Sequence, residues 1–88
     1  MTESELREME TRCNRATKGP WESFVEGRDH FSGSNFIRTG GLDDTSPDIE
    51  LSGASVEDQD FIAHARQDVP ALLAEVRRLR VIAGESNA

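Results

Sequence analysis

The chain has 88 residues and a mass of 9.8 kDa, which is near the lower limit for a domain with its own hydrophobic core. Seventeen acidic and ten basic residues give a formal charge of −7, and such a field repels duplex nucleic acid and anionic membrane surfaces. No apolar run approaches the ~20 residues of a membrane-spanning helix, and the first ten residues are too polar for a signal peptide. We therefore expect a cytoplasmic protein with one domain over residues 1–88.

Disulfides and metal ions are the usual supports of so small a core, and the sequence favours neither. Cys13 is the only cysteine, and together with His30 and His64 it makes a poor set of metal ligands. We expect no metal and no cofactor. Self-association is the remaining way to complete the core, so we expect a homo-oligomer, a dimer or larger.

The first segment, residues 2–18, predicts a helix. Thr2 and Glu5 have the spacing of a capping box, in which each side chain binds an amide that the first turn leaves unpaired. Apolar residues then recur at spacings of three and four, on one face: Leu6, Met9, Cys13 and Ala16. The glycine–proline pair at 19–20 ends the helix.

Three short segments, 21–26, 35–39 and 48–52, have the pattern of strands. In the first, Trp21, Ser23 and Val25 alternate with polar or larger side chains, as expected where a strand presents two faces. The connections between the segments are rich in glycine, serine and aspartate, which favour turns. A three-stranded antiparallel meander is the simplest arrangement.

The last third is helical but contains Pro70. Ser55 and Asp58 form a second capping box, whereas Pro70 removes a backbone donor and disfavours helix at the preceding residue. Asp68 is placed to cap a new helix. We expect two consecutive helices, or one with a marked kink, which gives an α+β fold in the order α-β-β-β-α-α.

The second half of this region carries a broad apolar stripe. It consists of Leu72, Leu73, Val76, Leu79 and Ile82. The stripe either forms the contact between subunits or covers the chain's own sheet, and the spacing alone leaves both interpretations open.

Polar and aromatic side chains gather in the loop at 26–34, among them Arg28, Asp29, His30, Phe31 and Ser32. If the flanking strands form a hairpin, Arg28 and Arg38 approach each other, and two guanidinium groups can bind phosphate and stack on flat rings. Asp29 can accept from a ribose hydroxyl, and Ser32 adds a neutral donor. The alternative is a polar hairpin in which both arginines pair with neighbouring acids.

Two further residues are candidates for the same ligand site. Trp21 either anchors the first helix against the sheet, which the lean composition favours, or stacks on a base. Phe31 lies in a polar loop and is the better stacking candidate. Arg66 lies near the proline and either contributes from a neighbouring element or is solvated helix surface.

Several stretches, among them 16–21, 24–30, 48–51 and 58–68, resemble a family of small, largely uncharacterised bacterial, phage and prophage proteins. The Glu-Gly-Arg-Asp-His sequence at 26–30 is the most specific of them. Some small phage oligomers trap nucleotide-derived immune signals. By analogy of size and context, the resemblance implies a bacterial host cell and an anti-defence role for this chain.

Two functions follow as hypotheses. The leading one is a non-enzymatic protein that sequesters a phosphate-bearing or nucleotide-derived ligand through Arg28, His30 and Arg38. The alternative is an acidic interaction module, such as an inhibitor or immunity-like protein, that covers a basic partner surface. An enzyme ranks third, because no nucleophile–base pair stands out in the sequence, and we assign no catalytic residues.

Overall fold

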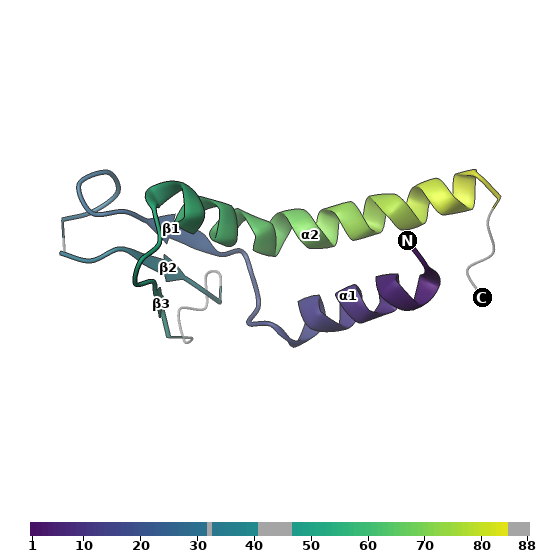
Figure 1. Ribbon diagram of the computed structural model, residues 1–88, viewed down its shortest axis with the longest axis horizontal. Coiled ribbons are helices and arrows are strands. Elements are labelled where there is room, and N and C mark those ends of the chain that lie inside the picture. Colours follow the sequence, from purple (N-terminus) through teal and green to yellow (C-terminus); the bar gives the residue numbers. More distant parts are fainter. Residues whose placement is uncertain (32, 41–46, 85–88) are drawn as a thin grey trace.

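The long helix α2 (Val56–Ile82) runs along the molecule and carries the other elements on one side (Figure 1). The structure is a computed structural model, and it describes residues 1–31, 33–40 and 47–84. In chain order the elements are α1 (Glu3–Arg15), β1 (Glu22–Phe24), β2 (Phe36–Arg38), β3 (Ile49–Glu50) and α2. The sheet lies against the first half of α2, and α1 lies antiparallel along the second half. The predicted α+β class and antiparallel meander are confirmed.

Both helices begin at the capping boxes that the sequence predicts. In α1, the Glu5 amide donates to Thr2 Oγ1 over 3.1 Å and the Thr2 amide donates to Glu5 Oε1 over 2.8 Å. Ser55 and Asp58 make the same reciprocal pair at the start of α2. α1 ends at Arg15, earlier than the glycine–proline pair that we expected to terminate it.

Of the two arrangements expected at Pro70, the pair of consecutive helices is wrong, because α2 continues through this residue as one helix. Pro70 has no amide to donate to the carbonyl four residues earlier, which ordinarily costs about 3 kcal/mol in a helix interior. Packing on both sides of the proline offsets this cost. Ala63, before it, is buried near the sheet, and Leu73, after it, is buried where α1 packs. Asp68, expected to cap a second helix, lies inside α2.

The sheet presents one face to α2. Ser23 of β1 and Ile37 of β2 are paired across the strands, and Ile37 is fully buried on the helix side. Their neighbours Phe24 and Phe36 are paired as well and point to the other face, where their rings stack with centroids 5.2 Å apart. The alternation predicted for the first strand is therefore present.

The packing of α1 on α2 combines one apolar contact with a group of ion pairs. Leu6 is fully buried, and Arg77 of α2 binds two carboxylates of α1 at once. Its Nε donates to Glu10 Oε2 over 2.8 Å, and its Nη1 donates to Glu3 Oε2 over 3.0 Å. The apolar core is small, as the composition predicts, and the described apolar residues that are buried are Leu6, Val25, Ile37, Ala63 and Leu73.

Candidate functional site

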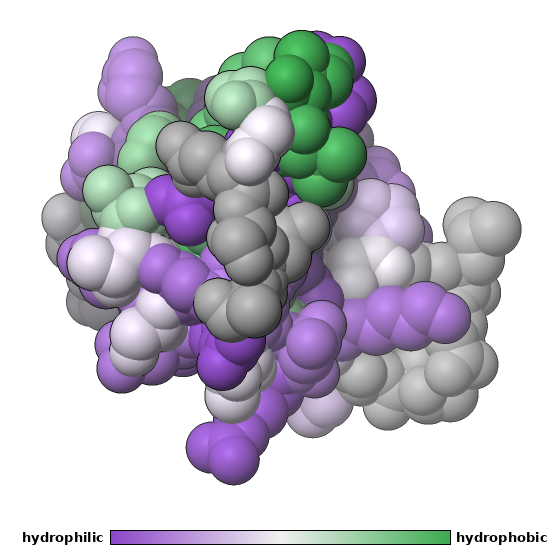
Figure 2. Space-filling view, turned by 90° about the vertical axis from the view of Figure 1, so that its right-hand side faces the viewer, coloured by the Kyte–Doolittle hydropathy of each residue, from purple (hydrophilic) through white to green (hydrophobic). Residues whose placement is uncertain are grey.

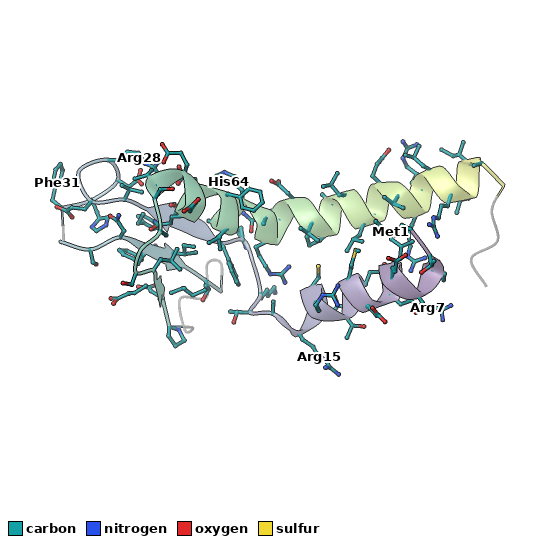
Figure 3. All side chains as sticks on the ribbon, viewed as in Figure 1. Met1, Arg7, Arg15, Arg28, Phe31 and His64 are labelled. Atoms are coloured by element: carbon teal, nitrogen blue, oxygen red, sulfur yellow. The ribbon has the colours of Figure 1, made fainter. Side chains whose placement is uncertain are left out.

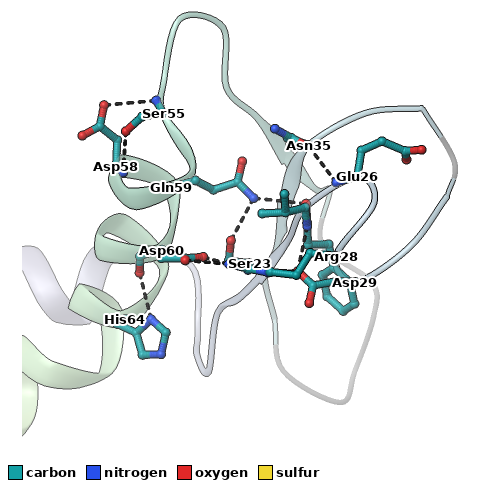
Figure 4. A network of polar contacts seen from close by, with 12 residues as sticks. Ser23, Glu26, Arg28, Asp29, Asn35, Ser55, Asp58, Gln59, Asp60 and His64 are labelled. Atoms are coloured by element: carbon teal, nitrogen blue, oxygen red, sulfur yellow. Dashed lines mark hydrogen bonds and ion pairs between the residues drawn. The ribbon is translucent and has the colours of Figure 1, made fainter.

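The polar cluster between α2 and the hairpin is organised by Gln59, whose side chain is buried (Figure 4). Its Nε2 lies 2.9 Å from Ser23 Oγ and 3.1 Å from the carbonyl oxygens of both Phe24 and Phe36. One amide group therefore holds the helix to two strands at once. The sequence alone does not single out Gln59, since its partners lie 23 to 36 residues away.

Two turns further along α2, Gln67 and Arg66 hold the segment that joins α1 to β1. Gln67 accepts from the Trp21 amide over 2.9 Å and donates to the Trp21 carbonyl over 3.1 Å. Arg66 Nε donates to the Thr17 carbonyl over 2.9 Å. This contact gives Arg66, a predicted ligand-binding residue, a structural role, although its side chain also borders a surface groove.

Arg28 is placed by a tight turn after β1. The amides of Arg28 and Asp29 both donate to the Val25 carbonyl, over 3.0 and 2.8 Å, and Asp29 Oδ2 accepts from the Val25 amide. Gly27 provides the positive φ of 84° that this reversal requires. The turn projects the Arg28 side chain toward the first turns of α2 (Figure 4).

The Arg28 guanidinium is bound by two carboxylates. It makes a bidentate pair with Asp60, at 2.8 and 2.9 Å, and its Nε donates to Asp29 over 2.9 Å. Hydrogen bonds from Arg28 and then Ser23 lower the pKa of Asp60 to about 2. The pKa of Asp29 is also lowered, mainly by its bond from the Val25 amide. All three groups are therefore ionised at neutral pH, and together they carry a net negative charge.

Arg28 and Arg38 do not meet across the hairpin, so this expectation is wrong. Arg28 lies on the helix side through Asp60, whereas Arg38 lies on the opposite face, with its guanidinium carbon 4.8 Å from the Phe24 ring centroid. His30 is on that opposite face too, and its ring centroid is 5.0 Å from that of Phe36. The strand period explains the separation, because Arg38 follows the inward-facing Ile37.

The remaining predicted ligand contacts are also scattered. Phe31 is 86% exposed and projects from the loop at the far end of the molecule, away from Arg28 (Figure 3). Trp21 is half-buried, and its Nε1 donates to the Thr17 carbonyl over 3.1 Å. Ser32 lies outside the described residues. The predicted cluster is thus divided among three places.

A cleft of about 520 Å³ opens beside Arg28 and unites part of the predicted set with residues that the sequence did not single out as a site. Its lining consists of Pro20, Trp21, Glu22, Ser23, Arg28, Asp60, His64 and Gln67. His64 Nδ1 lies 2.8 Å from the Asp60 carbonyl oxygen, which orients the imidazole at the edge of the cleft. A ring and hydrogen-bonding groups can fit here, but Glu22 and Asp60 make the site unfavourable for an anion.

The net negative charge of the chain lies in the part that contains the sheet. Residues 21–60 hold ten acidic and two basic residues, a charge of −8, and the rest of the chain carries +1. The two basic residues are Arg28, which two carboxylates neutralise, and Arg38, which lies over Phe24. Exposed acids of the described part include Glu22, Asp48, Glu50 and Glu57. The acidic pair at 43–44, which contributes to this charge, lies outside the described residues.

Neither a metal centre nor a membrane span is found in the described ranges. No three histidine, cysteine or acidic side chains there are grouped as metal ligands, and neither helix combines the length and apolar character needed to cross a bilayer. Comparison of the chain with protein-family models, curated proteins and solved structures finds no match. The resemblance to small phage and prophage proteins therefore stays a prediction.

Proposed function

We propose that the protein is a non-enzymatic interaction module whose acidic sheet end binds a basic surface of a partner protein. The observation that carries this proposal is the confinement of a charge of −8 to residues 21–60. A field of this size attracts basic surfaces and accelerates their association, while it repels nucleic acid and other anions.

Ion pairs at the helical end increase the contrast in charge between the two ends of the molecule. Arg77 binds Glu3 and Glu10, and Arg78 binds Glu75, so these two cations of the helical end are neutralised by carboxylates of the same end. At the sheet end, acids such as Glu50 and Glu57 remain exposed to a partner. Negative charge is therefore available for binding where the sheet and the start of α2 meet.

The test is salt-sensitive capture by matched charge variants. Tagged wild-type protein, Glu50→Lys and Glu8→Lys are used to capture partners from a bacterial lysate at low salt, followed by elution with increasing NaCl. Glu50 is exposed on β3, Glu8 is exposed on α1, and both changes alter the net charge by the same amount. We expect a basic partner that elutes with moderate salt, is lost with Glu50→Lys and is retained with Glu8→Lys. Equal retention by the two variants would exclude the sheet end as the binding surface.

The cleft beside Arg28 supports a second candidate function, the binding of a nucleotide-derived small molecule. Trp21 and His64 offer rings for stacking, and Arg28 is the cation at the cleft. Asp60 disfavours the binding of a phosphate there, because its carboxylate already accepts hydrogen bonds from two N–H groups of Arg28. Sequestration of an immune signalling nucleotide, as in a phage anti-defence protein, would use this cleft.

Thermal-shift screening against cyclic nucleotides and ADP-ribose derivatives tests this second function. We expect the melting temperature to rise with a true ligand, and the rise to disappear in Trp21→Ala. Asp60→Asn removes the competing carboxylate and is expected to strengthen binding of a phosphate-bearing ligand. If no compound in the series shifts the melting temperature of either wild type or Asp60→Asn, the small-ligand function is refuted.

A further inference from the structure

The structure divides the apolar stripe of α2 between two faces. Leu73 is only 6% exposed and is buried, whereas Leu72 is 63% exposed and Leu79 is 50% exposed. Apolar positions that are exposed or half-buried continue toward both ends of the helix with spacings of three and four: Ile62, Ala65, Val69, Leu72, Val76, Leu79 and Ala83. We call these seven residues the outer stripe. This period is that of a helix seam that packs against another helix.

The outer stripe has no charged member from one end to the other, and Phe61 extends it at the sheet end with 76% of its surface exposed. Figure 2 views the end of the molecule where α2 finishes, and apolar surface gathers there over the helix. A single-chain α2 needs only one apolar face for its sheet and α1. The second apolar face is therefore not needed for packing within one chain.

At the sheet end the outer stripe widens into a groove of about 240 Å³ between α2 and the end of α1. Ile62, Ala65 and Val69 line it from α2, and Trp21 closes it. Arg12 and Arg66 are the charged residues of its lining. The edge of the outer stripe that borders α1 is thus basic.

The other edge of the outer stripe is acidic. Asp68 and Glu75 precede Val69 and Val76 in the sequence, so they flank the seam on the side away from Leu73. When two identical helices pack side by side in the same direction, the opposite edges of their seams face each other. Asp68 of one copy then lies at about the same height along the helix axis as Arg66 of the other. In an antiparallel pair the two acidic edges would meet instead.

The area available is sufficient for a specific contact. A large apolar side chain offers about 150–200 Å², so the partly exposed side chains of this face offer on the order of 600 Å² per chain. Two copies would bury about 1,200 Å², which is at the lower end of stable interfaces. The small core of the single chain points the same way, because the described part buries only five apolar residues and oligomerisation is one way in which a small chain gains further burial.

We propose that the outer stripe is the contact of a two-fold symmetric homodimer in which two α2 helices run parallel. Leu72 of one copy packs on Leu72 of the other, and the acidic edge of each helix faces the basic edge of its partner. This interface uses the helical half of the molecule. It leaves the acidic face around β3 and the start of α2 available in both copies.

Sedimentation equilibrium of the full chain tests the dimer, with Leu72→Glu as the disrupting variant and Ala71→Glu as its matched control. Ala71 is also exposed but lies outside the outer stripe, and both changes add one negative charge. We expect a mass of about twice 9.8 kDa for wild type and Ala71→Glu. Leu72→Glu is expected to dissociate on the order of 100-fold more readily, because it buries two adjacent charges. A monomeric wild type at 100 µM, or equal effects of the two variants, would overturn the proposal.

The direction of the helices is tested by disulfide formation. Leu79→Cys is prepared in a chain whose single native cysteine, Cys13, is replaced by serine. In a parallel pair the two introduced thiols face each other and form an intermolecular disulfide rapidly, whereas Ala71→Cys does not. In an antiparallel pair centred on Leu72, position 79 faces position 65. Cross-linking of Ala65→Cys combined with Leu79→Cys, but not of Leu79→Cys alone, would therefore refute the parallel arrangement. Far-UV circular dichroism confirms that each variant is folded.

Discussion

Replacing Gln59 with leucine should remove the main polar connection between α2 and the sheet. The Gln59 side chain is buried, and its Nε2 lies within 3.1 Å of three oxygen acceptors on β1 and β2. Leucine fills nearly the same volume but cannot donate. The Gln59 amide has two N–H groups, so leucine leaves about two hydrogen bonds unmade at about 1–3 kcal/mol each, and the added apolar burial returns about 1 kcal/mol.

We therefore expect Gln59→Leu to lower the free energy of unfolding by about 1–5 kcal/mol. For a chain of this size the Tm should fall by about 4–8 °C for each kcal/mol lost. Urea and thermal unfolding, followed by circular dichroism at one fixed protein concentration, measure both quantities. The concentration is fixed because dimerisation would contribute to the apparent stability.

Two further variants decide whether the loss comes from these hydrogen bonds. Ser23→Ala removes one of the three acceptors, and a double-mutant cycle with Gln59→Leu should show a coupling of about 0.5–1.5 kcal/mol. Gln67→Leu removes a half-buried pair of bonds to Trp21 and should cost less than Gln59→Leu. A loss below about 0.5 kcal/mol for Gln59→Leu would refute the reasoning, because that is the range of an ordinary surface substitution.

Four other substitutions give outcomes that can be checked by unfolding experiments. Leu6→Ala should destabilise the fold by about 2–5 kcal/mol, because Leu6 is fully buried, whereas Leu79→Ala, measured at a concentration where the chain is monomeric, should change the stability by less than about 0.5 kcal/mol. Pro70→Ala should stabilise the protein by about 1–3 kcal/mol without a change in helix content by circular dichroism, and a rise in helix content would mean that the helix is broken there. Because the pKa of Asp60 is lowered to about 2, its pair with Arg28 stabilises the fold above the carboxyl's ordinary value near 3.8 and is lost as the pH falls through 2. The stability difference between wild type and Asp60→Asn should therefore shrink from pH 5 to pH 2, and a difference that stays constant would contradict the assignment.

The parts of the fold that depend on near neighbours could be predicted from the sequence. Each capping box is complete within four residues, so Thr2 and Ser55 mark the helix starts correctly. Pro70 shows where a local rule fails, because contacts with the sheet and α1 maintain the helix on both sides of it. Local preferences decide an element only when distant packing does not oppose them.

The candidate site could be predicted only in part, since its pairings span the chain. Arg28 was identified as a functional cation, but its principal partner, Asp60, is 32 residues away. The alternation of faces predicted for the first strand, extended to the second, places Arg38 on the face opposite Ile37. No spacing rule indicates which of Leu72 and Leu73 faces α1, because that depends on where α1 lies.

The contacts of Gln59 and Gln67 set a limit on how the chain can vary in length. The two side chains lie eight residues apart on α2, about 2.2 helical turns; Gln59 reaches β1 and Gln67 reaches Trp21, the residue before β1. A single inserted residue between them would rotate one by about 100° relative to the other, so both cannot then reach this continuous segment. Insertions and deletions should accordingly be absent from 59–67 in any natural variant that keeps this fold, whereas the last turn of α2 can be extended without disturbing the sheet.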